Sequence, residues 1–221
     1  MSEPIVMCFS GGKDSAMTLY ELKRQPQFDV VALITTVTEN YDRISMHGVR
    51  RTLLHQQAAS LGIPLEEVSI SPQASNEEYE ANMGTTFIKY REQGIRKVAF
   101  GDIFLEDLKE YRENQLGQLQ LECLFPIWKR ETRELVETFI DLKFRAFTSC
   151  VDPNVLDKTF AGRLIDAEFV ASLPEGVDPC GENGEFHSFV FDGPIFKFPI
   201  PVTTGEIVSR DSFLFCDLVS D

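Results

Sequence analysis

The beginning of the chain combines a short apolar run, a glycine-containing loop and a helical pattern. Residues 4–9 are almost entirely apolar and short enough for a buried strand, and residues 15–23 carry helical spacing through Met17 and Leu22. The loop between them, residues 10–15, reads Ser-Gly-Gly-Lys-Asp-Ser. Such a strand–turn–helix unit indicates an α/β fold.

The same alternation continues through the first half of the chain. Three further β-rich runs are expected as strands, and two longer segments are expected as helices that end at Gly62 and Gly94. The expected strands are residues 28–36, 65–70 and 97–100, and the expected helices are residues 49–61 and 76–93. Strands that alternate with helices of this length predict a parallel sheet with helices on both faces.

The second half of the chain differs in composition, since glycine, proline and phenylalanine dominate it from Pro174 onward. Here the patterns predict a helix over residues 132–142 and strands over residues 144–151, 186–191 and 207–215. The change predicts two domains, residues 1–120 and residues 121–221, of which the second is a smaller α+β domain.

The charge and the cysteines exclude several classes of function. The 221-residue chain has 35 acidic and 21 basic side chains and a net charge of −14, and so acidic a surface repels the phosphates of nucleic acids. The five cysteines are scattered without a C-x-x-C pair, which favours reduced thiols over disulfides or a zinc site. No apolar run approaches the ~20 residues that cross a membrane. We therefore expect a cytoplasmic protein without nucleic-acid or membrane partners. The acidic surface is compatible with a protein partner, and a homodimer is possible.

The loop at residues 10–15 has the chemistry of an anion site. Glycines let the backbone approach an anion closely, and the start of the helix offers unpaired N–H groups. The lysine adds a positive charge, and the two serines add hydroxyl donors. The loop is not a Walker A loop, whose first glycine would fall at Met7. It resembles the signature of the PP-loop ATP pyrophosphatases, which implies a HUP-type Rossmann-like sheet and cleavage of ATP between its α- and β-phosphates.

Later motifs, taken in their order along the chain, resemble the diphthine–ammonia ligase family. These motifs are Ser45-Met46-His47-Gly48, residues 57–65, Gly101-Asp102-Ile103, Tyr111-Arg112-Glu113, Phe125-Pro126-Ile127-Trp128, residues 181–187 and residues 192–196. The resemblance implies a ligase that adenylates a carboxylate, releases pyrophosphate and lets ammonia displace AMP to form an amide. It also implies ATP and Mg²⁺ as cofactors. The implied acceptor is diphthine, a modified histidine on an elongation factor.

The same resemblance assigns roles to individual residues. Lys13 would stabilise the pyrophosphate leaving group, and Asp14 would bind Mg²⁺ or order the loop. The implied ATP-binding residues are Ser10, Gly11, Gly12, Lys13, Asp14, Ser15, Met46, His47, Gly101 and Asp102. The implied acceptor-binding residues are Arg112, Glu113, Glu182, Glu185 and His187. Glu182 and Glu185 would also act in catalysis, by holding a quaternary ammonium group or guiding ammonia.

Some of these positions depart from the family pattern or have simpler interpretations. Asn183 stands where glycine is commoner, and Phe186-His187-Ser188 stands where Tyr-Glu-Thr is commoner, which leaves the identity of the acceptor open. Asp102 stands where alanine is more usual, and it is equally well interpreted as the cap of the next helix. Arg112 and Glu113 are equally well interpreted as an exposed charge pair on a helix.

Two other functions share the nucleotide loop. A PP-loop enzyme that modifies tRNA, such as a thiolase or a lysidine synthetase, is disfavoured by the net charge and by the missing pair of catalytic cysteines. For such chemistry the thiols near turns are Cys150 and Cys180. A non-catalytic sensor of adenine nucleotides would need neither Lys13 nor an acidic acceptor loop, and this sequence has both.

Overall fold

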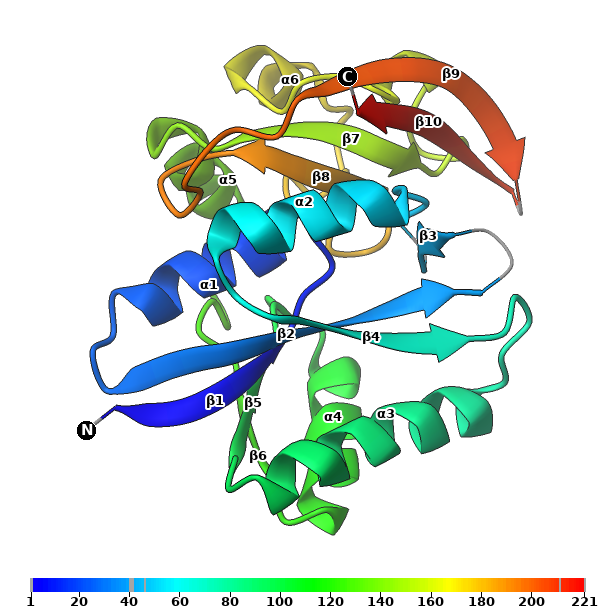
Figure 1. The fold of residues 1–221 in the computed structure, drawn as a ribbon. Coiled ribbons are helices and arrows are strands. Elements are labelled where there is room, and N and C mark those ends of the chain that lie inside the picture. The colour runs from blue at the N-terminus through cyan, green and yellow to red at the C-terminus, as the bar shows by residue number, and fades with distance from the viewer. Residues whose placement is uncertain (1, 40–41, 46, 211, 221) are drawn as a thin grey trace.

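The computed structural model describes residues 2–39, 42–45, 47–210 and 212–220, which form two sheets with helices between and around them (Figure 1). The first sheet contains β1 (Glu3–Cys8), β2 (Phe28–Thr38), β3 (Arg43–Ile44), β4 (Leu65–Ile70), β5 (Lys97–Ala99) and β6 (Glu122–Leu124). The parallel order is β4-β2-β1-β5-β6, and β3 pairs antiparallel with the end of β2. The predicted Rossmann-like parallel sheet is confirmed.

Alternate side chains of β1 serve the two faces of this sheet. Ile5 and Met7 belong to the apolar cluster of α1 (Lys13–Lys23) and α2 (Arg51–Leu61). Val6 belongs to the cluster of α3 (Asn76–Glu92) and α4 (Glu106–Gln118). Because the side-chain period of a strand is two, each face receives its own pair of helices, as Figure 1 shows. The predicted helices on both faces are therefore present.

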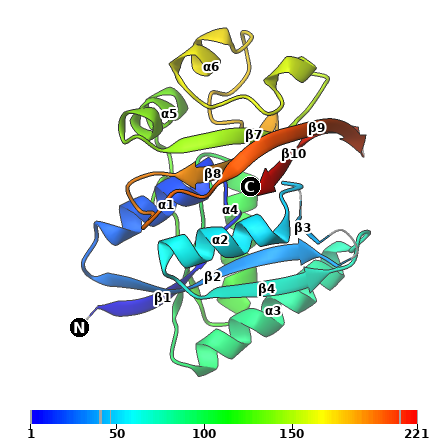
Figure 2. The same cartoon turned by 45° about the horizontal axis from the view of Figure 1, so that its top comes forward.

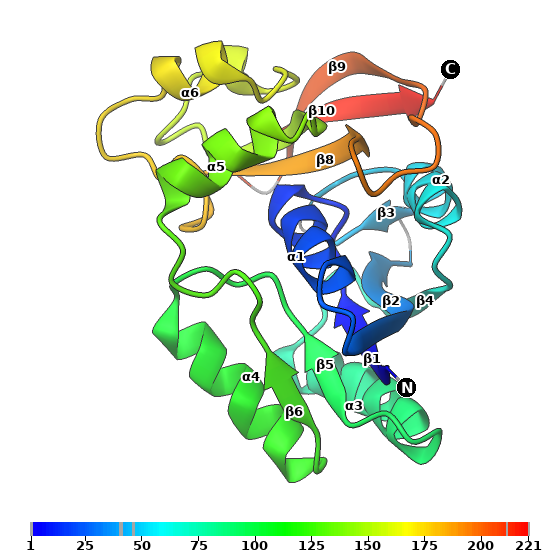
Figure 3. The same cartoon turned by 90° about the vertical axis from the view of Figure 1, so that its left-hand side faces the viewer.

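The second sheet is antiparallel, with the strand order β8-β7-β10-β9. Its strands are β7 (Arg145–Val151), β8 (Phe186–Asp192), β9 (Val202–Arg210) and β10 (Phe213–Ser220). The accompanying helices are α5 (Thr132–Asp141), the 3₁₀ helix η1 (Lys158–Phe160) and α6 (Ala167–Ser172). The sheet lies over α1 and α2, and α6 lies beyond it (Figures 2 and 3). The predicted smaller α+β domain is confirmed.

The predicted single strand over residues 207–215 is wrong. The segment crosses a hairpin, because β9 ends at Arg210 and β10 begins at Phe213. Ser212 has a φ of 69°, the left-handed conformation that tight turns use. Apolar side chains on both sides of a short polar turn give one continuous β-rich pattern, so the pattern alone does not show the reversal.

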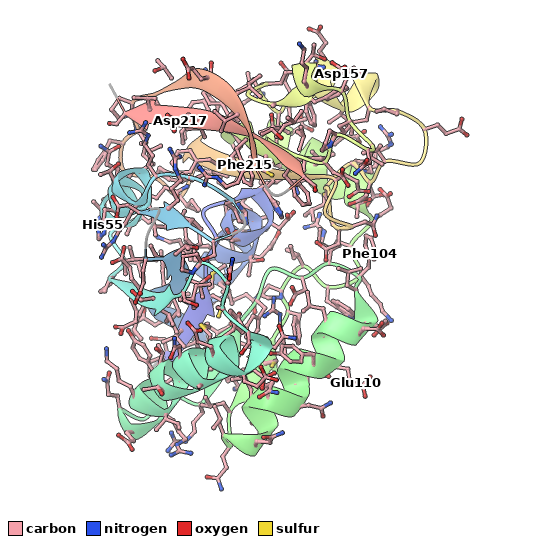
Figure 4. All side chains as sticks on the ribbon, turned by 90° about the vertical axis from the view of Figure 1, so that its right-hand side faces the viewer. His55, Phe104, Glu110, Asp157, Phe215 and Asp217 are labelled. Atoms are coloured by element: carbon pink, nitrogen blue, oxygen red, sulfur yellow. The ribbon has the colours of Figure 1, made fainter. Side chains whose placement is uncertain are left out.

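The two sheets share one hydrophobic core. One apolar cluster contains Met17 and Leu19 of α1 together with Phe189 of β8 and Leu218 of β10. A charged contact adds to this interface. Asp217 of β10, labelled in Figure 4, accepts hydrogen bonds from the guanidinium groups of Arg43 at 3.0 Å and Arg50 at 2.6 Å.

Some sequence-based expectations stay predictions. They are the boundary near residue 120, the cytoplasmic location and the homodimer. Among the helices in the described part of the chain, none is both long and apolar enough to cross a bilayer.

Candidate active site

The candidate site lies where the order of the parallel strands changes direction. β1 and β5 are neighbours in the sheet although they are far apart in sequence, and open α/β sheets bind ligands beyond the carboxyl ends of such strands. The loop at residues 9–12 follows β1, and Gly101 follows β5. Both line a cavity of about 570 Å³ that we call the inter-sheet cavity. Residues 180–182, 184 and 186–188, from the second half of the chain, line it as well.

The backbone of the loop is held by contacts on two sides. Gly11 has a φ of 79°, and its carbonyl accepts hydrogen bonds from the N–H of Val190 and the Nε2 of Gln57, each at 2.9 Å. The same Nε2 also donates to the Val190 carbonyl at 2.6 Å. A side chain at position 11 would collide with the Gln57 amide, so glycine is required there both for its φ and for space.

The two loop serines face each other across the start of α1. Their hydroxyl oxygens lie 3.3 Å apart, and the Ser15 hydroxyl donates to the Gly12 carbonyl at 2.9 Å. The Ser10 hydroxyl accepts the Gly12 N–H at 3.3 Å. All three residues line the inter-sheet cavity.

Lys13 is buried, with only 1% of the residue exposed, and its ammonium group pairs with the Asp14 carboxylate. Burial lowers the pKa of Lys13, but the Asp14 carboxylate and hydrogen bonds outweigh this effect, so the pKa stays above its ordinary value and the lysine is charged. The Asp14 side chain is 28% exposed and lines the cavity. The pair therefore places a fixed positive charge beside the loop and a carboxylate at the cavity wall.

Asp102 is held by an arginine instead of capping a helix. Its carboxylate accepts hydrogen bonds from Arg112 at 2.6 Å and 3.1 Å, and α4 has Leu105 at its N-cap position. The guanidinium of Arg112 also lies 4.4 Å from the centre of the Phe100 ring. Asp102 and Arg112 both line the cavity and reach it as one ion pair.

Glu113 does not join its predicted partner Arg112 in the site. Its carboxylate accepts a hydrogen bond from Lys109, one turn earlier in α4, at 2.5 Å, and its side chain is 47% exposed. Since residues one apart in a helix point in different directions, Arg112 faces the cavity while Glu113 faces solvent.

The two predicted glutamates of the 182–185 segment have different surroundings. Glu182 lines the cavity, and one carboxylate oxygen accepts the Ile103 N–H at 2.7 Å. Burial raises the pKa of Glu182 to about 7, and the nearby carboxylates of Asp14 and Asp102 act in the same direction. The ionisation of Glu182 therefore falls near neutral pH.

Glu185 instead holds its own loop together. The residue is buried, and its carboxylate accepts hydrogen bonds at 3.0 Å from the Asp178 N–H, the Asn183 N–H and the Asn183 side-chain amide. Its oxygen atoms are therefore occupied by donors of residues 178–183. Asn183, at a position where the family pattern favours glycine, supplies two of those three donors.

The two histidines predicted from opposite halves of the chain lie together. The rings of His47 and His187 have centroids 4.5 Å apart, and His47 Nδ1 is 3.3 Å from the Ser188 carbonyl oxygen. Burial lowers the pKa of His47 to about 3 and that of His187 to about 4, so both rings are neutral at pH 7. Met46, also predicted to contact ATP, lies outside the described residues.

Among the residues that hold the loop, Gln57 and Ser188 carried no predicted role. Gln57 holds Gly11, and the Ser188 hydroxyl accepts the Lys13 N–H at 3.0 Å. Both belong to motifs of the resemblance, at residues 57–65 and 186–188. The available signal for Gln57 was a polar side chain among the apolar positions of a helix face, because a buried polar group needs a partner.

The cysteines named for tRNA thiolation are poorly suited to it. Cys150 and Cys180 are both 2% exposed, and burial raises the pKa of each thiol to about 12. Thiolate is the reactive form, so neither thiol is activated at neutral pH. This geometry disfavours the thiolase alternative.

Comparisons with known proteins identify the family. A model described as the diphthamide synthase N-terminal domain matches residues 3–119, and one described as the diphthamide synthase C-terminal domain matches residues 131–219. The chain belongs to the diphthamide synthase family. As a member, it is an ATP-dependent amide-forming ligase, and the resemblance to diphthine–ammonia ligases is confirmed.

Relatives of this diphthamide synthase family member include two proteins named diphthine–ammonia ligase. The one from Mus musculus is 25% identical over 95% of this chain and 87% of its own length. The one from Danio rerio is 28% identical over 95% of this chain and 91% of its own length. The U34-tRNA thiolase NcsA from Methanococcus maripaludis aligns with 64% of this chain and 58% of its own, with a TM-score of 0.41 and 17% identity. At that score the structural likeness carries no functional inference.

Proposed function

We propose that this chain binds ATP in the inter-sheet cavity and adenylates the carboxylate of an acceptor, after which ammonia displaces AMP. The observation that supports this most strongly is the position of the 10–15 loop, at the strand-order switch and facing a cavity closed by residues 180–188. Because the relatives are named diphthine–ammonia ligase, diphthine on a translation factor is the proposed acceptor.

The reaction consists of two displacements. A carboxylate oxygen of the acceptor attacks the α-phosphorus of ATP, the bond to the bridging oxygen of the β-phosphate breaks, and pyrophosphate leaves. The nitrogen of ammonia then attacks the acyl carbon, and the carbon–oxygen bond to AMP breaks. In this scheme the loop serines and the N–H groups of Asp14 and Ser15 bind the phosphates, since the Lys13 N–H already donates to Ser188. The charge of Lys13, buried beside the loop, stabilises the departing pyrophosphate.

Asp14 is the proposed Mg²⁺ ligand. The described residues contain no group of three or more side chains arranged to hold a metal ion by themselves. In ATP sites Mg²⁺ commonly takes one or two carboxylates and completes its coordination with phosphate oxygens and water. Asp14 lines the cavity beside the loop and fits this pattern, whereas both oxygens of Asp102 accept hydrogen bonds from Arg112. The ion would neutralise charge on the phosphates.

Glu182 is the proposed proton acceptor for the second displacement. Ammonia must lose a proton when its nitrogen bonds to the acyl carbon, and an efficient base has a pKa near the working pH. Glu182 lines the cavity and has a pKa of about 7, which meets this requirement. The buried Glu185 supports the loop that carries Glu182.

The proposal is tested by incubating the protein with ATP, Mg²⁺, ammonium and a translation factor that carries diphthine, and by measuring AMP, pyrophosphate and the amide. Lys13→Ala should lower AMP release by about two to three orders of magnitude, the typical loss for one charge-stabilising donor. The exposed Lys158 provides the control, and Lys158→Ala should not change the rate. Near-normal AMP release by Lys13→Ala would refute the loop assignment. AMP release with other carboxylates but not with diphthine would refute the acceptor.

A further inference from the structure

Strand β8 of the second sheet runs directly against the nucleotide loop. The Ser188 hydroxyl accepts the backbone N–H of Lys13 at 3.0 Å, and the Val190 N–H donates to the Gly11 carbonyl at 2.9 Å. Ser188 contacts the loop through its side chain and Val190 through its backbone. The two domains thus meet along the loop itself.

The Ser188 hydroxyl still has a hydrogen to donate. A serine hydroxyl has one donor and two acceptor positions, and the Lys13 N–H uses one acceptor position. Ser188 is only 5% exposed, and no described residue accepts its hydrogen. Ser188 nevertheless lines the inter-sheet cavity beside Ser10 and Ser15. Because Ser188 lines the cavity, a bound group there can accept this hydrogen.

We propose that Ser188 is a nucleotide-binding residue that the second domain supplies to the first. Its oxygen holds the Lys13 N–H, and its O–H donates to a phosphate oxygen of ATP. This inference rests on the proposed function, since it takes ATP as the ligand of the cavity. The role is absent from the sequence-based assignment, which placed the phosphate contacts in residues 10–15 alone.

The test measures direct binding of α,β-methylene-ATP with Mg²⁺ by calorimetry, because this analogue resists cleavage and no acceptor is needed. Ser188→Ala and the nearly isosteric Ser188→Cys should weaken binding about 10- to 100-fold, the usual range for a hydrogen bond to a charged group. Ser188→Thr keeps the hydroxyl and should bind within about threefold of the unchanged protein. The unfolding temperature of each variant without nucleotide shows whether weaker binding comes from the missing contact or from a less stable protein.

A neighbouring serine provides the matched control. Ser149 of β7 is 1% exposed, its hydroxyl has no hydrogen-bond partner among the described residues, and it does not line the cavity. Ser149→Ala should bind the analogue unchanged. Equal affinity of Ser188→Ala, Ser188→Cys and the unchanged protein would overturn the inference, as would a loss in Ser188→Thr as large as in Ser188→Ala. Failure of the unchanged protein to bind the analogue would count against the proposed function instead.

Discussion

Replacing Gln57 with leucine removes the side-chain amide that connects the nucleotide loop to the second sheet. Gln57 is fully buried, and its Nε2 donates to the Gly11 carbonyl at 2.9 Å and to the Val190 carbonyl at 2.6 Å. The other amide atom, Oε1, has no hydrogen-bond partner among the described residues. Leucine has a similar volume, so the substitution mainly changes hydrogen bonding and leaves little cavity.

The magnitude follows from these contacts. Each lost hydrogen bond costs about 1 kcal/mol net, and a buried carbonyl left without a donor adds about 1–3 kcal/mol. The Gly11 carbonyl keeps its hydrogen bond from Val190. Removal of the buried, unpartnered Oε1 is favourable and reduces the loss of stability. We expect the free energy of unfolding to fall by about 2 kcal/mol, and the melting temperature to fall by roughly 4–8 °C for a chain of this length.

Urea unfolding without nucleotide measures this change. Gln56→Leu is the matched control, because the adjacent Gln56 amide donates to Ser220 at 3.0 Å from a partly exposed position and should contribute less than about 1 kcal/mol. The Gln57→Leu variant should also bind ATP more weakly, since Gly11 loses one of its two fixed contacts. A Gln57→Leu protein as stable as the unchanged protein would show that the unpartnered Oε1 offsets both hydrogen bonds, and would refute the reasoning.

Two further predictions concern the acceptor loop and the acid range. Glu185→Gln should lower the free energy of unfolding by about 1–3 kcal/mol, because the carboxylate accepts three hydrogen bonds and an amide cannot replace all of them. Calorimetry should show unchanged affinity for ATP, and steady-state kinetics should show a raised KM for the acceptor. Weakened ATP binding would contradict this prediction. The histidines are protonated near pH 6.5 when unfolded but only near pH 3 and 4 when folded, so stability should fall as the pH drops from about 6.5 to 4.5. Glu182, with its raised pKa, acts oppositely in this range, so urea titrations should show a steeper fall for Glu182→Gln and a shallower one for His47→Asn. Equal slopes in all three proteins would contradict the assignment.

Strand β1 of the first sheet was predictable because its residues form a continuous apolar run. Ile5 and Met7 face one helix layer and Val6 the other, so the pattern of β1 is continuous and apolar, as expected for a strand buried on both faces. Helix α4 was not predicted, because Leu116 is its one buried residue and a largely exposed helix carries almost no apolar period. The hairpin between β9 and β10 was missed for the opposite reason, since apolar residues continue on both sides of the turn.

The site was predictable where it is local in sequence and not where it is assembled from distant segments. Residues 10–15 indicate an anion site by their own composition. The contact of Ser188 with Lys13 joins residues 175 positions apart, and no local pattern encodes such a pairing. The same holds for Asp102, which pairs with Arg112 of α4 and does not cap that helix. The roles of Glu182 and Glu185 differ because one faces the cavity and the other its own backbone, which spacing alone does not distinguish.

The contact between β8 and the loop has a consequence for how the protein is made. A ribosome releases the chain from its N-terminus, so the first sheet can form while residues beyond 186 are still unsynthesised. At that stage Lys13 lacks its serine partner and Gly11 lacks the bond from Val190. A nascent or truncated chain that stops before β8 therefore carries an incomplete loop, and on the role proposed for Ser188 it binds ATP more weakly than the full chain. Stabilisation by bound nucleotide is therefore greatest for chains in which β8 has been synthesised and packed against the loop.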